Sequence, residues 1–456
     1  MHHGIRLLAA TLAAATLCAV PSAPAAGKPA ANPATNPNWV TSWAASVQGP
    51  YPVGNPSAQP NLSLVFPAPE TGARDQSFRL IIKPELWGGK ARLRFSNALG
   101  TQPVTFDGVY AGLQWSGSAV VPGTNRAVTF GKQASVTVAP GQSVWSDAVA
   151  LPFVKKGNDM LGRKLAVSFH VAGTSGPMTW HAKALQSSYV TLPGAGAKGA
   201  EIAEAAFPFA TASWYFLDAL DVAAPKGAGT IVTFGDSITD GTASTMNGDD
   251  RWPDVLARRL AARPGNQLAV VNHGIGGNQV IGPKEYSIAK PFAGGPSALQ
   301  RLERDVLTLS NVKAVIWLEG INDFSKNGNA EAEAVIAGMR QGVARMRAAL
   351  PGVKVIGATV VSALGSTSAA HGFELQDEKR KKLNDFIRMP ISSGGAFDGV
   401  ADFDRVILDE KTGGMKAEFV PDNTVGGPGD KLHPNRMGYQ AMGMTIDLSL
   451  FDKLRK

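Results

Sequence analysis

The chain has 456 residues, of which 44% are hydrophobic and 18% charged, and it carries a formal net charge of +8. This length is too great for one small core and predicts two domains. The basic residues are scattered, and no aromatic residues are interleaved with the one tight cluster at 379–382. We therefore expect a solvated helix face at this cluster and no nucleic-acid binding.

Residues 1–25 have the features of a secretory signal peptide. Arg6 is the only charged residue before the apolar run Leu7–Val20, and Ala23-Pro24-Ala25 supplies a cleavage site. The run is shorter than the roughly 18 to 20 residues of a membrane span, and no later segment is long and apolar enough to form one. The lone cysteine, Cys18, lies inside the run, so the mature chain is expected to have no disulfide. The sequence thus predicts a secreted or periplasmic protein, exported as in bacteria.

A linker and a β-rich domain follow. Residues 26–38 are rich in Pro, Ala and Asn and predict the linker. Residues 39–222 contain short β-like runs, separated by turn residues, at 78–83, 91–95, 104–111, 134–138, 165–171 and 188–192. This pattern predicts a β-sandwich of jelly-roll-like type. We expect core packing for most of its tryptophans (Trp43, Trp87, Trp115, Trp145 and Trp180), and a carbohydrate-binding platform is the alternative.

The pattern changes after the Pro- and Gly-containing segment 223–229. Strand-like runs at 230–235, 268–272, 314–319, 354–361 and 399–403 alternate with helical segments near 252–263, 297–309, 330–350, 377–389 and 436–446. Repeated strand–helix units predict a parallel sheet with helices on both faces. Residues 223–456 are therefore expected to form a three-layer, flavodoxin-like α/β domain.

A serine follows the first strand of this second domain. Ser237 lies in Gly235-Asp236-Ser237-Ile238, at the strand end where open α/β sheets build their sites. A serine hydroxyl is a weak nucleophile and needs a base. Near the C-terminus, His433 can act as that base, and Asp430, three residues earlier, can orient its ring. The sequence therefore predicts Ser237, His433 and Asp430 as catalytic residues.

Two further blocks lie at the ends of the second and third strands. The first contains Gly274, Gly276 and Gly277, and the second contains Asn322. The tetrahedral intermediate of acyl transfer carries an oxyanion that needs preorganised donors. The backbone N–H of Ser237, a glycine N–H and the Asn322 amide can supply three.

These four blocks, in this order, resemble the SGNH hydrolases, also called the GDSL esterase/lipase family. The resemblance implies a Ser237–His433–Asp430 triad, an oxyanion hole of Ser237, Gly277 and Asn322, and no cofactor. Gly277 is preferred when Asn272 is aligned with the asparagine that often opens the family's second block. The Gly-x-Ser-x-Gly elbow of the α/β-hydrolases is absent from the chain.

The front half resembles a secreted bacterial subgroup of this family. Similar members carry an N-terminal β-rich domain with a phrase like Ala91-Arg92-Leu93-Arg94-Phe95-Ser96-Asn97. They also show a segment like Arg251-Trp252-Pro253-Asp254-Val255-Leu256 after the nucleophile block. Some relatives are linked to the deacetylation of xylan or other polysaccharides, and many are unassigned esterases.

The polar residues beside the blocks have structural interpretations. We expect the carboxylates to brace turns and His273 to be structural or to line the pocket wall; the carboxylates are Asp236, Asp240 and Asp323. Glu319 is either a buried, paired carboxylate or part of the pocket. The seven histidines form no metal-binding pair beyond His2-His3, so we expect no metal site.

The sequence thus predicts a serine esterase that acts on a small-molecule or polysaccharide ester through an acyl-enzyme. Short acyl chains are expected, such as acetyl groups on polysaccharides. One alternative is a lipase or acyltransferase acting on longer acyl chains. A second alternative is a carbohydrate-binding role for the N-terminal domain, and the oligomeric state stays open.

Overall fold

The computed structural model describes residues 1, 37–155, 160–421 and 427–455. The signal peptide and most of the linker fall outside the described residues, so both stay predictions. Residues 38–456 form one compact unit. The division of this unit into domains after residue 222 also stays a prediction, although the chain changes there from antiparallel to parallel sheets.

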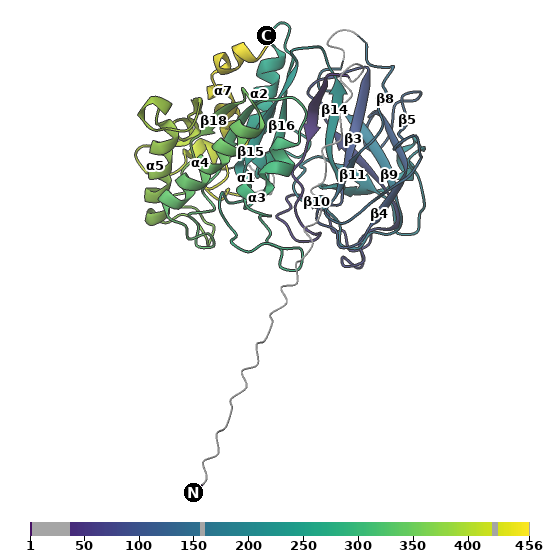
Figure 1. The fold of residues 1–456 in the computed structure, drawn as a ribbon, viewed down its shortest axis with the longest axis horizontal. Helices are drawn as coiled ribbons and strands as arrows, with labels where there is room; N and C mark the ends of the chain where they lie inside the picture. Colours follow the sequence, from purple (N-terminus) through teal and green to yellow (C-terminus); the bar gives the residue numbers. More distant parts are fainter. Residues whose placement is uncertain (2–36, 156–159, 422–426, 456) are drawn as a thin grey trace. The chain divides into compact units, whose positions relative to one another are not determined.

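The β-rich part is built from two antiparallel sheets with a shared core (Figure 1). In spatial order, the first sheet contains β1 (Trp39–Ala44), β14 (Leu217–Ala223), β3 (Lys90–Ser96) and β7 (Ser143–Trp145), with β8 (Val149–Ala150) beside β3. The second contains β12 (Phe209–Thr211), β11 (Ser188–Val190), β2 (Arg74–Ile82), β9 (Leu165–Thr174), β4 (Val104–Leu113) and β5 (Arg126–Ala127), with β6 (Val136–Val138) beside β4. A separate ladder joins β10 (Trp180–His181) to β13 (Trp214–Tyr215). The predicted sandwich is confirmed.

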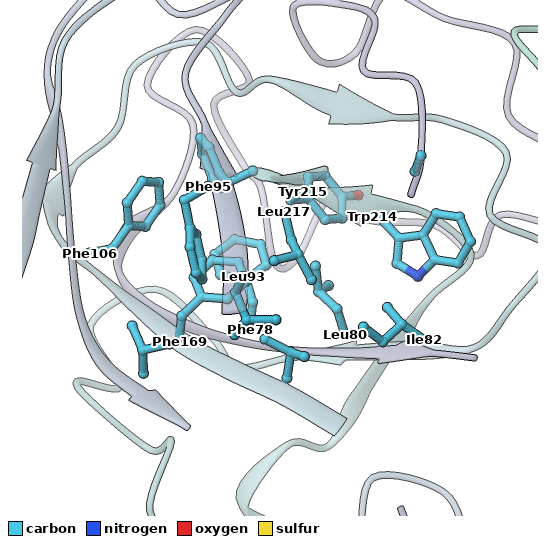
Figure 2. Packing of buried hydrophobic residues seen from close by; sticks show 14 of the residues in the cluster. Phe78, Leu80, Ile82, Leu93, Phe95, Phe106, Phe169, Trp214, Tyr215 and Leu217 are labelled. Atoms are coloured by element: carbon cyan, nitrogen blue, oxygen red, sulfur yellow. The ribbon is translucent and has the colours of Figure 1, made fainter. Parts of the chain in front are cut away.

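Aromatic side chains fill the space between the two sheets (Figure 2). Phe78 and Phe169 of the second sheet stack with ring centroids 5.1 Å apart. Phe95 of the first sheet meets Phe169 edge-on at 5.2 Å. Ring pairs at these distances add to the free energy gained by burying apolar area. Phe78, Leu80 and Ile82 alternate along β2 and all belong to this core, as expected for a strand with one face buried.

The tryptophans of the β-rich part divide between the core and the surface. Trp43 and Trp180 are buried, as predicted, whereas Trp87 and Trp145 are half-buried and pack against hydrophobic clusters. Trp115 is 68% exposed. Among these five residues, Trp115 is therefore the one that could meet a ligand with most of its ring.

The second part contains a five-stranded parallel sheet. Its spatial order is β16 (Leu268–Gly274), β15 (Gly229–Gly235), β17 (Val312–Leu318), β18 (Lys354–Ala358) and β19 (Gly399–Ala401). Numbered within this part, the order is 2-1-3-4-5, which is that of flavodoxin-like sheets. The order reverses at β15, so the segments that follow β15, β16 and β17 meet at one end of the sheet.

Helices cover both faces of the parallel sheet (Figure 1). One face carries α1 (Ser237–Asp240), α2 (Trp252–Ala261), α6 (Phe403–Ile407) and α7 (Arg436–Thr445); the other carries α3 (Ala298–Leu302), α4 (Ala332–Ala349) and α5 (Glu374–Arg388). Ile231 packs on the first face and Val232 on the second, because successive strand residues point in opposite directions. Short 3-10 helices complete the part at Ile391–Ser393, Ala417–Phe419 and Leu448–Arg455, and another, Glu204–Ala206, lies in the β-rich part. The predicted three-layer α/β fold is confirmed.

Several predicted elements end elsewhere than the sequence pattern suggested, and three of them show why. The helix expected at 297–309 consists of α3 followed by a π-helical turn at Glu303–Leu307. The strands expected at 354–361 and 399–403 end at Ala358 and Ala401. The apolar residues beyond these strand ends are buried in a loop and in α6. An apolar run indicates that residues are buried, but it does not show that they pair as a strand.

The basic cluster at 379–382 is not a uniformly solvated helix face. Arg380 is fully buried on α5 and pairs with Asp377 and Asp404 at 2.7 and 2.6 Å. Lys379 is 8% exposed and donates to the carbonyl oxygen of Ala330. The side chain of Lys381 is 61% exposed. The prediction of a solvated face was therefore wrong for Lys379 and Arg380, which the turn of the helix carries toward the protein interior.

Arginines of β3 join the β-rich part to the parallel sheet. Arg92 pairs with Asp221 at 2.7 Å and also donates to Ser310 Oγ. Arg94 pairs with Asp218 at 2.7 Å and donates to Thr308 Oγ1. Both arginines lie in the 91–97 phrase that resembles the secreted subgroup. This phrase therefore forms part of the junction between the two parts.

The second subgroup segment, 251–256, lies at the same junction. Arg251 donates to the carbonyl oxygen of Ala184, and Asp254 lies 3.4 Å from Lys83 Nζ. Ala184 and Lys83 belong to the β-rich part. Both segments that mark the resemblance thus hold the two parts together.

Candidate active site

Ser237 opens the one-turn helix α1 directly after β15. The Asp236 carboxylate caps this helix by accepting the Ile238 N–H at 2.9 Å, which is the brace predicted for it. Gly235 leaves no room for a side chain, because a Cβ there would lie 2.2 Å from the carbonyl oxygen of Leu318. Ser237 is thereby held at the C-terminal edge of the sheet, where its side chain meets the late-chain loop.

The structure brings Ser237, His433 and Asp430 together. Ser237 Oγ lies 2.8 Å from His433 Nε2, although 196 residues separate them in sequence. On the other side of the ring, His433 Nδ1 lies 2.6 Å from Asp430 Oδ2. This is the geometry that base-assisted attack by a serine requires.

Asp430 is held as a carboxylate. Its Oδ1 accepts the backbone N–H groups of Leu432 and His433 at 2.9 and 2.8 Å. Burial alone would raise the pKa of Asp430, but the hydrogen bond from the His433 ring and these N–H groups outweigh it. The pKa of Asp430 is therefore held well below its usual value, and the residue is charged at neutral pH.

One of the three candidate glycines has its N–H free. The Gly274 N–H donates to Asn272 Oδ1 at 2.9 Å, and the Gly276 N–H donates to Asp240 Oδ2 at 3.0 Å. The Gly277 N–H has no acceptor in the described parts of the chain. Among these three donors, only that of Gly277 is available to a substrate. Asp240 was predicted to brace the turn of the nucleophile, and its carboxylate instead holds the glycine turn of the second block.

Asn322 lies at the end of β17, close to this turn. Its Nδ2 donates one hydrogen to the carbonyl oxygen of Asn278 at 2.9 Å, which leaves the second amide hydrogen for another acceptor. The next residue, Asp323, accepts the N–H groups of Val280 and Ile281 and so braces the segment after the glycines, as predicted. The structure thus places the predicted Asn322 donor on a rigid support.

Arg301 is a central residue of the site's support that sequence reasoning missed. It is fully buried on α3 and donates to the carbonyl oxygens of Gly235 and His273 at 2.8 and 2.9 Å. It also donates to Asn278 Oδ1 at 2.7 Å and pairs with Asp305. Because these contacts join the ends of β15 and β16, Arg301 fixes the spacing of the first two blocks. No motif in the sequence marks it.

His273 is structural. It is fully buried, and its Nδ1 lies 2.8 Å from Ser46 Oγ of the β-rich part. Burial lowers the pKa of His273 to about 3, so the ring is neutral near pH 7. Of the two predicted roles, the structural one is therefore confirmed.

Buried acids lie beneath the site. Glu319 is fully buried, and its Oε2 accepts the Trp317 indole N–H at 2.7 Å. Burial raises the pKa of Glu319 to about 7 and that of Asp323 to about 7, and the charge of Glu319 adds to the rise at Asp323. Arg301, 3.8 Å from Glu319, offsets the effect only in part. Of the two interpretations predicted for Glu319, the structure therefore favours the buried carboxylate.

Replacing Glu319 by glutamine should stabilise the protein more at about pH 8 than at about pH 5. The pKa of Glu319 is higher in the folded state than in the unfolded state. At pH values above the ordinary glutamate pKa, ionisation of Glu319 therefore favours the unfolded state and lowers the free energy of unfolding. This cost grows as the pH rises to the folded value of about 7. Urea titrations should show a relative gain of roughly 2 kcal/mol or more between the two pH values. Glu285→Gln, at an exposed ion pair, is the control, and an equal effect of Glu319→Gln at both pH values would contradict the assignment.

The β-rich part also reaches the nucleophile turn. Lys183 is 3% exposed and donates to Thr242 Oγ1, and His181 Nε2 lies 3.1 Å from Asp240 Oδ1. Burial lowers the pKa of Lys183, whereas the charge of Asp240 acts in the opposite direction. These contacts join segments about 60 residues apart along the chain, and no sequence signal pointed to them.

The part of the chain that the structure describes contains no group of three or more His, Cys, Asp or Glu residues that could hold a metal ion. In the same residues, no helix combines the length and hydropathy that crossing a membrane requires.

Residues 233–441 match the sequence profile of the GDSL-like lipase/acylhydrolase family. The chain contains a GDSL-like lipase/acylhydrolase domain. This domain spans all four predicted blocks, from the end of β15 to the loop that carries His433. The protein is accordingly a carboxylic ester hydrolase. A search of curated protein sequences gives no match.

Solved structures with a likeness to the protein include several esterases. An aryl esterase from M. smegmatis is 18% identical, with 48% of this chain and 95% of that chain covered and a TM-score of 0.35. A carbohydrate acetylesterase from Sinorhizobium meliloti is 15% identical, with 47% and 94% covered and a TM-score of 0.33. A GDSL-like lipase from Bacteroides thetaiotaomicron is 17% identical, with 49% and 88% covered and a TM-score of 0.35.

Proposed function

We propose that the protein is a secreted serine esterase that hydrolyses short acyl esters, with acetyl groups on polysaccharides as the substrate class. The observation that carries the proposal is the hydrogen-bonded line from Ser237 Oγ through the His433 ring to Asp430. Each member supplies a chemical role that the others lack. Ser237 is the nucleophile, His433 the base and Asp430 the orienting carboxylate.

In the first half of the reaction, Ser237 Oγ attacks the ester carbonyl while His433 Nε2 takes the hydroxyl proton. Asp430 accepts the Nδ1–H and stabilises the imidazolium that forms. As the tetrahedral intermediate collapses, His433 gives the proton to the leaving alcohol, and the acyl group remains on Ser237. In the second half, His433 takes a proton from water, which attacks the acyl-enzyme. As this second tetrahedral intermediate collapses, His433 returns the proton to Ser237 Oγ, and the acid leaves.

The oxyanion of each tetrahedral intermediate would bind three donors. These are the Ser237 N–H in the first turn of α1, the free Gly277 N–H and the second amide hydrogen of Asn322. Losing one such donor typically lowers kcat by roughly 100- to 1000-fold. No cofactor takes part in this scheme.

Polar groups around the nucleophile favour a small acyl group and a hydroxyl-rich alcohol. The loop that contains Ser366 and Thr367 lies against Asp430, donating to its carbonyl oxygen at 2.7 and 3.1 Å. His371 of the same loop is close enough for the charge of His433 to lower its pKa, after the larger effect of burial. Such a lining suits a sugar better than a long alkyl chain.

A lipase or acyltransferase with a longer acyl chain is the second candidate. A cavity of about 530 Å³ beside the His433 loop is lined in part by apolar residues, which include Leu364, Met415 and Val420. This cavity could accept an alkyl chain if the substrate reached it from Ser237. The acyl-chain preference of the enzyme separates the two candidates.

Initial rates on p-nitrophenyl acetate, butyrate and palmitate, with acetate release from acetylated xylan in parallel, test the proposal. We expect the highest kcat/KM on acetate, together with release of acetate from the polysaccharide. A maximum on palmitate would favour the lipase. Fast hydrolysis of the short ester without release from xylan would reject polysaccharides as the substrate class and leave a general esterase.

Export and carbohydrate binding are separate parts of the proposal. Export rests on the 1–25 segment, and the exported protein should begin at Ala26, which N-terminal sequencing checks. A carbohydrate-binding role of the β-rich part would rest on exposed Trp115. Retention of the whole protein on insoluble xylan, compared with Trp115→Ala, tests that role.

A further inference from the structure

The oxyanion donor of Gly277 belongs to the peptide group that joins Gly276 to Gly277. In a planar trans peptide the C=O and the N–H point in opposite directions. A contact that fixes the Gly276 carbonyl oxygen therefore also fixes the direction of the Gly277 N–H. The group that bonds the Gly276 carbonyl oxygen therefore helps to position a donor of the oxyanion hole.

The β-rich part supplies this partner. Asn55 Nδ2 donates to the Gly276 carbonyl oxygen at 2.6 Å, across 221 residues of sequence. The contact is tight, because a Cβ on Gly277 would lie 2.8 Å from Asn55 Nδ2. A donor to the C=O also polarises the peptide and strengthens its N–H as a hydrogen-bond donor.

The peptide needs such a partner because its two residues are glycines. Gly277 has a φ of +86°, and glycine backbone passes between conformations with little steric resistance. Asp240 holds the preceding peptide through the Gly276 N–H, but this contact leaves the Gly276 carbonyl oxygen free to turn. A flip of the 276–277 peptide would aim a carbonyl oxygen at the oxyanion in place of a donor, and the two negative charges would repel each other.

We propose that Asn55 is a positioning residue of the esterase reaction, which holds the Gly276–Gly277 peptide so that its N–H faces the oxyanion. The inference rests on the proposed function, because it assigns this peptide to the oxyanion hole. It also gives the β-rich part a direct role in turnover, since a side chain outside the GDSL-like domain completes the catalytic crevice.

Asn55→Ala and Asn55→Asp test the role. In Asn55→Ala the kcat on p-nitrophenyl acetate should fall by about ten-fold with KM nearly unchanged, because a misplaced donor weakens the transition state and not the bound ester. Asn55→Asp keeps the shape of the side chain but places a carboxylate beside a carbonyl oxygen, so its kcat should fall further. Affinity for phenylboronic acid, which forms a tetrahedral adduct with a serine, should weaken in parallel with kcat.

The matched control is Gln59→Ala. Gln59 lies in the same segment, and its side-chain hydrogen bonds with described residues stay within the β-rich part, to Ala212, Thr211 and Tyr215. Melting temperatures show whether each variant is folded. If both Asn55 variants keep the kcat and the boronic-acid affinity of Gln59→Ala, the inference is wrong. Ser237→Ala is assayed alongside. If Ser237→Ala keeps its esterase activity, the proposed function is wrong. If Ser237→Ala loses its activity while both Asn55 variants keep the kcat of the parent enzyme, only the role of Asn55 is wrong.

Discussion

Replacement of Ser237 by alanine should lower kcat on p-nitrophenyl acetate by at least about 10⁴-fold. The change removes the oxygen that forms the acyl-enzyme, and no neighbouring hydroxyl faces His433 Nε2 in its place among the described residues. The fold should persist, because the cap of α1 is supplied by Asp236 and not by the Ser237 side chain. Initial rates and the melting temperature, measured on the same preparation, check both statements.

Ser244→Ala is the matched control for this substitution. Ser244 lies shortly after α1 and is equally buried, but its Oγ has no hydrogen-bond partner among the described residues. Its removal should leave kcat within about two-fold of the parent enzyme and should not lower stability. If Ser237→Ala keeps more than about 1% of the parent kcat, Ser237 is not the nucleophile.

Replacement of Asp430 by asparagine should lower kcat by about 10⁴-fold, with a much smaller effect on KM. The asparagine fills the same space but removes the charge that stabilises the His433 imidazolium. Its amide can also face Nδ1 with a donor, which would hold the ring in the tautomer that cannot accept the serine proton. Steady-state kinetics on the short ester measure the loss.

Asp447→Asn controls for the loss of a loop aspartate in general. Asp447 accepts the backbone N–H and the hydroxyl of Ser449 near the C-terminus, away from His433. Its variant should retain the parent kcat. A comparable kcat in Asp430→Asn and Asp447→Asn would show that Asp430 does not take part in the reaction.

The parallel sheet and the nucleophile position could be read from the sequence because their signals are local. The run 230–235 ends at Gly235, and the chain that follows must turn at the sheet edge. Ser237 could therefore be placed at that edge without knowledge of any distant contact. The spacing of Asp430 and His433, three residues apart, suited an orienting carboxylate and a base, and the order of the four blocks supported both through the family resemblance.

The supports of the site could not be read in the same way. Asn55, Lys183 and Arg301 act through contacts with segments between 23 and 255 residues away, and each lies in a stretch with no motif. An asparagine in a loop or an arginine on a helix has many possible partners, and only the fold selects one. The buried half of the basic cluster on α5 escaped prediction for the same reason.

The junction between the two parts explains why the β-rich part matters to the site. Arg92 and Arg94 fasten it to the GDSL-like domain through the hydroxyls of Ser310 and Thr308, and Arg251 of that domain donates back to the carbonyl oxygen of Ala184. Asn55 and Lys183 then reach the glycine turn and the nucleophile turn from this fixed frame. The β-rich part thus supplies contacts to both turns of the site, whether or not it also binds carbohydrate.

The most direct test of the account is covalent trapping with a p-nitrophenyl phosphonate, followed by mass spectrometry of the intact protein and of its peptides. We expect one adduct per chain, located on Ser237, which is absent from Ser237→Ala and forms more slowly in Asp430→Asn. An adduct on any other residue, or loss of esterase activity without an adduct on Ser237, would contradict it.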